Sequence, residues 1–238
     1  MDTNTDQFFN DNLFENKEPE PETIVKEEEV SPVESFDELG LKETLLRGLY
    51  GYGFEKPSSI QKRAVPMVLT GGDVIAQSQS GTGKTGAFSI SALQLVDESV
   101  KSTQVLIISP THELSRQTLS VIDNISSYMK VTTCSVIGGT NVGECKSDLQ
   151  KRPHVIVGTP GRILDMLGKG FLESGSLKLM IFDEADEILS SGFKDTIYNI
   201  VKLTPKNMQI CLFSATMPGD VVELTDRFMN KPKRLLMK

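Results

Sequence analysis

The sequence predicts an α/β protein in which helices flank an open parallel sheet. Apolar runs of strand length alternate with segments of helical periodicity, and short loops join them. The run at 177–182, LKLMIF, is apolar throughout, as expected for a parallel strand buried on both faces. Polar motifs follow three of the strands, at the ends where ligands of such sheets bind. We expect one domain, with its site at that edge of the sheet.

The first 35 residues differ from the rest in charge. They hold eleven acidic and two basic side chains, with several prolines and few apolar residues. Such a composition buries too little apolar surface to offset the entropy lost on ordering. We therefore expect an acidic disordered tail over 1–35 and a folded domain over 36–238. That domain carries 21 acidic and 23 basic side chains, so nucleic acid would have to bind a local basic patch.

Two helices are expected before the first strand of the domain. The first has an apolar stripe, made by Leu41, Leu45, Leu46 and Leu49, and Gly51 and Gly53 should break it. Ser58 or Ser59 can cap the second helix, over 60–69. Within it, Pro66 should kink the helix or end it early.

A phosphate-binding loop is expected between the strand ending at Val74-Ile75-Ala76 and the next helix. The stretch AQSQSGTGKT, 76–85, places Gly-Lys-Thr in a glycine-containing turn at a helix N-terminus, where backbone N–H groups and the helix dipole favour phosphate. Lys84 can reach the β and γ phosphates, and the Thr85 hydroxyl can hold magnesium. Ser78 stands where the strict motif has glycine. A glycine-rich turn without a nucleotide is the alternative interpretation.

Further strands are expected at 103–109, 131–137, 154–157, 177–182, 208–213 and 233–237. The helices between them are expected after Pro110, near 142–149, after the TPGR turn at 159–162, after 183, at 193–203 and at 221–228. The phosphate loop, Asp183-Glu184 and Ser214-Ala215-Thr216 all follow strand ends. We therefore expect these three segments to converge.

Asp183 ends an apolar strand, where a second magnesium contact opposite a phosphate loop must lie. It could hold the ion directly or through water, while Glu184 orients or deprotonates the attacking water. The alternative is an acidic helix start, since aspartate and glutamate favour that end of the dipole. Phe54 and Gln61 could stack on and hydrogen-bond an adenine, although a core phenylalanine and a solvated glutamine are the simpler interpretation.

The cysteines and the termini suggest a protein inside the cell. Cys134, Cys145 and Cys211 lack any CxxC or metal-site spacing, so we expect reduced, mostly buried thiols. The N-terminus lacks a basic segment followed by an apolar core, and no apolar run is long enough to span a bilayer. We expect an intracellular protein without a membrane segment, in the cytoplasm or the nucleus.

From about Phe36 onward, the chain resembles the first RecA-like domain of DEAD-box RNA helicases. The motifs that carry the resemblance are GFEKPSSIQ, AQSQSGTGKT, PTHEL, IGGTNVGE, GTPGR, DEAD and SAT, in that family's order. Within the family, the chain is most similar to the group of translation initiation factor 4A and its exon-junction relative. The serine at position 78 is then no anomaly, because the family's loop does not keep the first glycine.

The resemblance implies a RecA-like P-loop NTPase domain that binds ATP and Mg²⁺. Phe54 would stack on the adenine, Lys56 would lie alongside it, and Gln61 would read its edge. The phosphates would bind the loop made of Gly81, Thr82, Gly83, Lys84, Thr85 and Gly86. Thr85 and Asp183 would hold magnesium, and Glu184 would activate water.

The resemblance also implies RNA as partner, bound through its backbone with little sequence preference. The residues that would line RNA are Pro110, Thr111, His112, Gly138, Gly139, Thr159, Gly161 and Arg162. Ser214 and Thr216 would connect the ATP site to strand separation through hydrogen bonds with the DEAD segment. Scaffold proteins of the initiation-factor or exon-junction type are possible partners, and we expect a monomer.

Two departures from the family's pattern matter. The family usually has arginine where this chain has His112, and histidine is largely uncharged near pH 7. We therefore expect weaker RNA affinity from this loop, strengthening as the pH falls. The chain also ends at Lys238, where the family continues into a linker and a second RecA-like domain that supplies arginine fingers. By itself the chain should bind ATP poorly and hydrolyse it barely.

Three functions follow from these motifs. The first is an ATP-dependent RNA helicase, represented by its ATP-binding domain and acting in translation initiation or other RNA metabolism. The second is a single-domain protein that binds nucleotide, RNA or helicase partners without turnover. The intact Lys84, Thr85, Asp183 and Glu184 favour the first. A DNA motor is a third, which the adenine segment and GTPGR disfavour.

Overall fold

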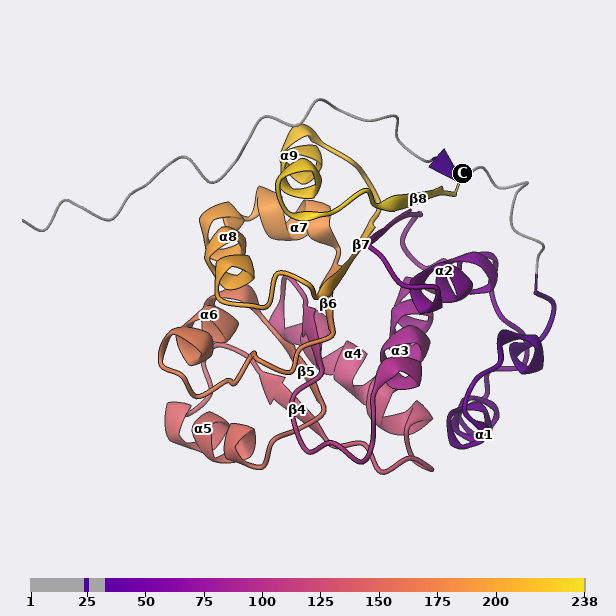
Figure 1. Ribbon diagram of the computed structural model, residues 1–238, viewed down its shortest axis with the longest axis horizontal. Helices are drawn as coiled ribbons and strands as arrows, with labels where there is room; N and C mark the ends of the chain where they lie inside the picture. Colours follow the sequence, from indigo (N-terminus) through magenta and orange to yellow (C-terminus); the bar gives the residue numbers. More distant parts are fainter. Residues whose placement is uncertain (1–23, 26–32, 238) are drawn as a thin grey trace, which may run out of the picture.

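The computed structural model describes residues 24–25 and 33–237 and shows a single sheet with helices on both faces (Figure 1). In these residues the strands are β1 (Ile24–Val25), β2 (Val74–Gln77), β3 (Val105–Ile108), β4 (Thr133–Val136), β5 (Val155–Gly158), β6 (Leu179–Asp183), β7 (Gln209–Ser214) and β8 (Lys233–Leu236). The helices are α1 (Glu43–Tyr52), α2 (Ser59–Leu69), α3 (Lys84–Leu95), α4 (His112–Ile125), α5 (Val142–Gln150), α6 (Pro160–Gly168), α7 (Ala185–Ser190), α8 (Lys194–Lys202) and α9 (Gly219–Phe228), with a 3₁₀ turn at Phe36–Leu39.

The sheet confirms the predicted class. Its strand order is β1-β8-β2-β7-β6-β3-β5-β4, and every neighbouring pair is parallel. This order places β2, β7 and β6 side by side near the middle of the sheet. The carboxyl ends of these three strands therefore lie at one edge, where their following loops meet.

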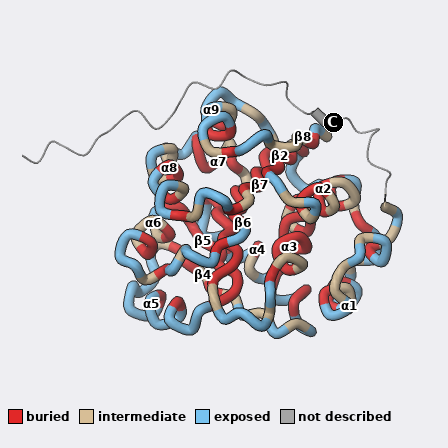
Figure 2. Tube along the Cα trace, viewed as in Figure 1, coloured by how far each residue is buried: buried red, intermediate tan, exposed pale blue. Residues whose placement is uncertain are grey.

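Two apolar cores hold the helices against the sheet, one on each face. In β6, Leu179 and Ile181 belong to the core that α1 to α4 cover, whereas Met180 and Phe182 belong to the core beneath α5 to α9. All five residues of β6 are buried, as its apolar sequence predicts. Figure 2 shows the buried strands between helices whose outer faces are exposed. Successive side chains of a strand point to opposite faces of the sheet, so β6 contributes side chains to both cores.

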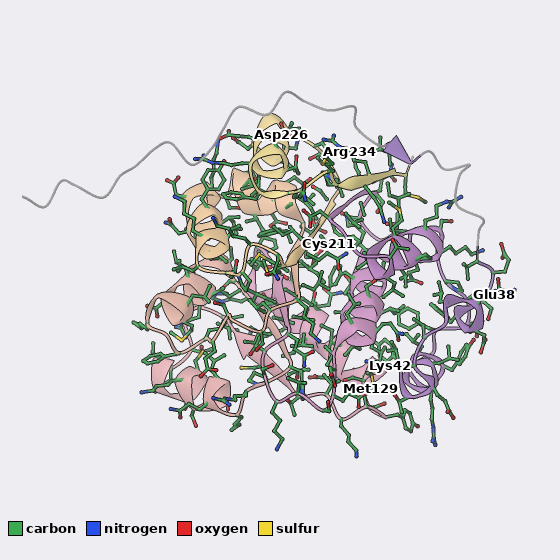
Figure 3. All side chains as sticks on the ribbon, viewed as in Figure 1. Glu38, Lys42, Met129, Cys211, Asp226 and Arg234 are labelled. Carbon is green, nitrogen blue, oxygen red and sulfur yellow. The ribbon has the colours of Figure 1, made fainter. Side chains whose placement is uncertain are left out.

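The helix that starts at the phosphate loop is also held at its far end. Lys42, labelled in Figure 3, precedes α1, and its ammonium donates to the carbonyls of Leu93 and Val96 at the end of α3. A cation at a helix C-terminus satisfies carbonyls that have no partner within the helix and stabilises the dipole. The segment before α1 thus helps to fix the helix that carries Lys84.

Several boundaries differ from the sequence-based expectations. α1 continues through Gly51 and ends at Gly53, whose φ of 101° only glycine adopts readily. Pro66 does not end α2 early, and the helix runs on to Leu69. Its neighbours Val65, Met67 and Val68 are buried in the core, so packing holds the helix despite the lost hydrogen bond. The 3₁₀ turn at Phe36–Leu39 was not expected.

The proposed acidic tail, 1–35, lies outside the described residues except for 24–25 and 33–35. Within that segment, β1 adds a parallel strand to β8, with Ile24 opposite Arg234 and Val25 opposite Leu235. β1 therefore forms one edge of the sheet and β4 forms the other among the described strands.

We expect Gly48→Ala to lower the free energy of unfolding by about 1–3 kcal/mol. Gly48 faces α4, and a Cβ there would lie 1.9 Å from the carbonyl oxygen of Ile125, which is backbone and cannot move aside alone. Gly51→Ala is the control, because its Cβ would meet nothing closer than the Tyr128 ring at 3.6 Å. Alanine there should stabilise α1 by up to about 1 kcal/mol. Urea unfolding measures both changes, and equal effects would contradict close packing of α1 on α4.

Candidate functional site

Three loops converge at the carboxyl ends of β2, β6 and β7. Gln77 pairs with Ser214 across β2 and β7, and Asp183 pairs with Phe213 across β6 and β7. The amide of Ser78 donates to the carbonyl of Ser214 at 3.0 Å, which ties the start of the phosphate loop to the end of β7. The strand order thus brings together the loop, the Asp183-Glu184 pair and Ser214–Thr216, as the sequence predicts.

The phosphate loop turns on two glycines. Gly81 has a φ of 80° and Gly83 a φ of 100°, values that favour glycine, and α3 begins directly afterwards at Lys84. Gly81 and Thr82 are exposed, and Thr85 is partly exposed in the first turn of α3. The Thr82 hydroxyl hydrogen-bonds the Ser78 hydroxyl at 2.9 Å across the loop. The helix N-terminus and the exposed turn fit a phosphate group.

Lys84 and Asp183 are buried at the centre of the site. Lys84 is 5% exposed, and its ammonium donates to the carbonyl of Ser78 at 2.9 Å. Burial raises the pKa of the Asp183 carboxyl to about 7; the charge of Glu184 adds to this rise, and that of Lys84 opposes it. The Asp183 carboxylate and the Thr85 hydroxyl are oxygen ligands of the kind that Mg²⁺ takes from proteins, alongside substrate phosphates.

Glu184 has an unusual backbone conformation. Its φ of 52° and ψ of 55° lie in the left-handed region, and it caps the N-terminus of α7. A non-glycine residue in this region costs about 1–2 kcal/mol. In the described part of the structure no hydrogen bond engages its carboxylate, which is partly exposed. The strained turn therefore presents an uncommitted carboxylate next to Asp183.

Gln61 and Phe54 pack against the phosphate loop. The Gln61 side chain accepts a hydrogen bond from the Ser58 amide at 2.9 Å and donates to the Gly83 carbonyl at 3.2 Å. A Cβ at Gly86 would lie 2.4 Å from the Gln61 amide nitrogen and 3.3 Å from the Phe54 ring. Gln61 thus joins the cap of α2 to the loop, a role that the sequence analysis missed. Lys56 is exposed nearby in sequence.

The segment after β7 bonds to the DEAD helix. Both the amide and the hydroxyl of Thr216 donate to the Asp186 carboxylate, at 2.9 and 2.6 Å. The Asp186 amide donates to the Ser214 hydroxyl, which in turn donates to the Thr216 carbonyl at 2.7 Å. The expected hydrogen bonds to the DEAD segment are therefore present, and Asp186 carries them. A part in strand separation stays a prediction.

A second cluster of predicted residues surrounds a shallow hollow, which we call the RNA-facing hollow after the role predicted for these residues. It is lined by Pro110, His112, Gly138, Thr159, Gly161, Arg162, Asp165 and Phe193. Six of the eight predicted RNA residues are among these, and Thr111 and Gly139 are not. Asp165 and Phe193 were missed: Asp165 lies one turn beyond Gly161 in α6, a spacing that could have identified it. Phe193 comes from a distant segment, and no local signal marks it.

Two helices begin at the RNA-facing hollow. Thr111 caps α4 by accepting the Leu114 amide at 3.2 Å, and Thr159 occupies the N-cap position of α6. The Thr159 hydroxyl also accepts the Gly138 amide at 3.3 Å, which fixes the loop after β4 beside α6. Arg162 donates to the hydroxyl and the carbonyl of Thr140 at 3.1 and 3.0 Å. Two helix N-termini and a guanidinium make the hollow suitable for phosphate.

Comparisons with known proteins agree with this geometry. Residues 58–225 match the DEAD/DEAH box helicase family. The chain is 50% identical over 218 residues to a Neurospora crassa protein named ATP-dependent RNA helicase eIF4A, covering 92% of this chain and 55% of that one. It is 54% identical over 206 residues to the Yarrowia lipolytica protein of that name, covering 87% of this chain and 52% of that one. The chain therefore spans about half the length of the curated relatives it matches.

Solved structures show the same fold. A DEAD box protein from Methanococcus jannaschii superimposes with a TM-score of 0.84 at 33% identity, over 87% of this chain and 57% of that one. Saccharomyces cerevisiae Dbp5 bound to RNA and ADP BeF3 superimposes with a TM-score of 0.80 at 37% identity, over 87% of this chain and 52% of that one.

Among the helices described in this chain, none is long and apolar enough to cross a membrane.

Proposed function

Because this chain belongs to the DEAD/DEAH box helicase family, we propose that it is the ATP-binding domain of an ATP-dependent RNA helicase of the initiation factor 4A type. One observation carries the proposal: a buried lysine, a buried aspartate and an uncommitted glutamate meet beside a glycine loop at a helix N-terminus. Phosphoryl transfer needs positioned phosphates, a metal ligand and a group that orients water, and these residues supply all three.

ATP and Mg²⁺ fit the residues at the loop. The turn at Gly81 to Gly86 and Lys84 would hold the phosphates, and Thr85 with Asp183 would hold the ion, which neutralises phosphate charge when bound. Glu184 would orient or deprotonate the attacking water. Phe54, Lys56 and Gln61 would surround the adenine. To bind adenine, the Gln61 side-chain amide would form hydrogen bonds to the base in addition to, or in place of, those to the Ser58 amide and the Gly83 carbonyl.

RNA would bind the RNA-facing hollow through its backbone. The hollow offers helix N-termini and Arg162 rather than a groove-reading helix, so contacts to phosphate and ribose should dominate and sequence preference should be slight. Ser214 and Thr216 would couple this surface to the nucleotide through Asp186.

We expect His112→Arg to strengthen RNA binding at neutral pH by about three- to tenfold, the range of one added phosphate contact. His112 lines the RNA-facing hollow, and a Cβ at Gly138 would lie 3.1 Å from its Nε2 atom. Arginine adds a permanently charged, planar guanidinium that can donate two hydrogen bonds to one phosphate. Fluorescence anisotropy with labelled oligouridine measures the change. The control is Lys206→Arg, which alters an exposed residue outside the hollow. Unchanged affinity for His112→Arg would contradict this RNA contact.

The second candidate is a non-catalytic domain that binds nucleotide, RNA or a partner. The partly exposed, strained Glu184 disfavours it, because pure binding requires no such group. Release of phosphate from ATP, stimulated by RNA once a second RecA-like domain is added, tests the helicase proposal. ATP binding without phosphate release in any mixture would favour the second candidate.

For either function we propose an intracellular monomer in the cytoplasm or nucleus, with scaffold proteins of initiation-factor or exon-junction type as partners.

A further inference from the structure

The sheet edge formed by β4 is the floor of a groove. β4 is last in the strand order, and no other strand in the described residues pairs with its outer side. α4 packs over one face of the sheet at this edge and α5 over the other. The space between them, about 610 Å³, is here the edge groove; its lining includes Arg116 and Asp123 of α4, Ser135 and Ile137 around β4, and Glu144 and Asp148 of α5.

The floor of the edge groove presents backbone groups that pair with no other strand of the described residues, although the Ser135 carbonyl accepts a hydrogen bond from the Cys134 thiol at 3.7 Å. The amide of Val155 donates to the carbonyl of Thr132, and that of Thr159 donates to Val136, so the even-numbered residues of β4 face β5. Backbone groups alternate along a strand, and those of Thr133 and Ser135 therefore point outward. The buried Ser135 hydroxyl also has no hydrogen-bond partner. These groups are a template for another strand.

Within residues 24–25 and 33–237, the chain does not supply that strand. Ile24–Val25 extend the opposite edge of the sheet, next to β8. The rest of the N-terminal segment is acidic, and so is the groove lining: it holds Asp123, Glu144 and Asp148 against Arg116, although Lys151 beside it pairs with Asp148 at 2.6 Å. A second copy of this chain pairing at β4 would likewise bring two acidic linings together. Like charges at close range disfavour both arrangements.

We propose that the edge groove binds an extended, lysine- or arginine-bearing peptide segment of a partner protein, which adds a strand to β4. Main-chain hydrogen bonds to the outward groups of Thr133 and Ser135 hold the segment. Basic side chains on alternate residues reach the acidic lining. Glu144 and Asp148 lie one turn apart on α5, about 6 Å along the helix, close to the roughly 7 Å between alternate residues of a strand.

The groove is separate from the nucleotide loop but adjoins the RNA-facing hollow. Thr140 lines the groove, and Arg162 of the hollow bonds to it. A segment bound in the groove thus lies next to the loop that fixes Arg162. The proposal does not rest on ATP hydrolysis, so it stands or falls independently of the proposed function.

The test is NMR titration of the ¹⁵N-labelled chain with an eight-residue peptide of alternating lysine and valine. We expect shift changes and slowed hydrogen exchange at the amides of Thr133 and Ser135. The matched peptide of alternating glutamate and valine should bind at least tenfold more weakly. Equal affinity for the two peptides, or shifts that avoid β4, would overturn the proposal. Oligouridine should leave the groove amides unshifted, and shifts there would assign the groove to RNA instead.

Variants separate the two contacts. Reversing both charges in Glu144→Lys with Asp148→Lys should weaken binding of the basic peptide about tenfold. The matched control is Asp195→Lys with Asp226→Lys on α8 and α9; Asp226 is labelled in Figure 3, at the far side of the domain from α5. Ser135→Pro removes an outward amide and no bond to β5, so it should abolish strand addition while the domain stays folded. If neither variant weakens binding, the peptide does not occupy the groove.

Discussion

A second RecA-like domain, produced separately and added with RNA, should raise the rate of ATP hydrolysis about 10³–10⁵-fold over this chain alone. In the transition state, negative charge spreads over the transferred phosphoryl oxygens. At the loop of this chain the buried cation is Lys84, which the carbonyl of Ser78 already engages. The resemblance to DEAD-box helicases implies that further cations, the arginine fingers, come from the second domain. This chain covers 55% and 52% of the lengths of two such relatives, so a large part of each has no counterpart in it.

Phosphate release at saturating ATP and oligouridine measures this gain while the second domain is titrated. The second domain alone and the mixture without RNA are the controls. A rate that saturates with the added domain would show that the two halves assemble into one site. A chain that hydrolyses ATP equally fast alone would contradict the argument from arginine fingers.

Glu184→Gln in the same mixture should lower the hydrolysis rate by about 10²–10⁴, the usual contribution of a positioned general base. The amide has nearly the shape of the carboxylate but cannot accept the water's proton. Since no hydrogen bond in the described residues engages the Glu184 carboxylate, the fold should tolerate the change and ATP binding should persist.

Glu187→Gln provides the matched control. It removes the same charge from the same helix, and Glu187 also raises the pKa of the Asp183 carboxyl. A general loss of negative charge near Asp183 would therefore affect both variants. If Glu187→Gln lowers the rate as much as Glu184→Gln, the role assigned to Glu184 is wrong.

The sequence predicts seven of the eight described strands because most of them are short, apolar and bounded by turn residues; β1 lies in the segment that was expected to be disordered. It also predicts that the phosphate loop, Asp183 and Ser214–Thr216 meet, since all three follow strand ends of a parallel sheet. Strand boundaries were less accurate: the run at 103–109 forms a strand only at Val105–Ile108. The flanking Gln104 and Ser109 are polar but buried, and their amides still donate to the carbonyls of His154 and Gly158, so neither burial nor periodicity marks where the strand ends.

Side-chain contacts that depend on how the helices pack could not be predicted. Gln61 caps α2 and bonds Gly83, and only the packing of α2 on α3 brings these residues together. Phe193 reaches the RNA-facing hollow from beyond α7, with no local pattern to reveal it. Likewise, helix propensity marks Gly48 only as a residue that destabilises a helix, whereas its missing side chain allows α1 to approach α4 closely.

The central claim is that the glycine loop and the adenine segment form one site for Mg-ATP. Isothermal titration calorimetry of this chain with Mg-ATP and Mg-GTP tests it most directly, with Lys84→Ala as the variant that should lose binding. We expect weak binding of ATP and at least about tenfold weaker binding of GTP, the worth of one or more net hydrogen bonds to adenine. Equal affinity for the two nucleotides, or ATP binding unaffected by Lys84→Ala, would contradict the account.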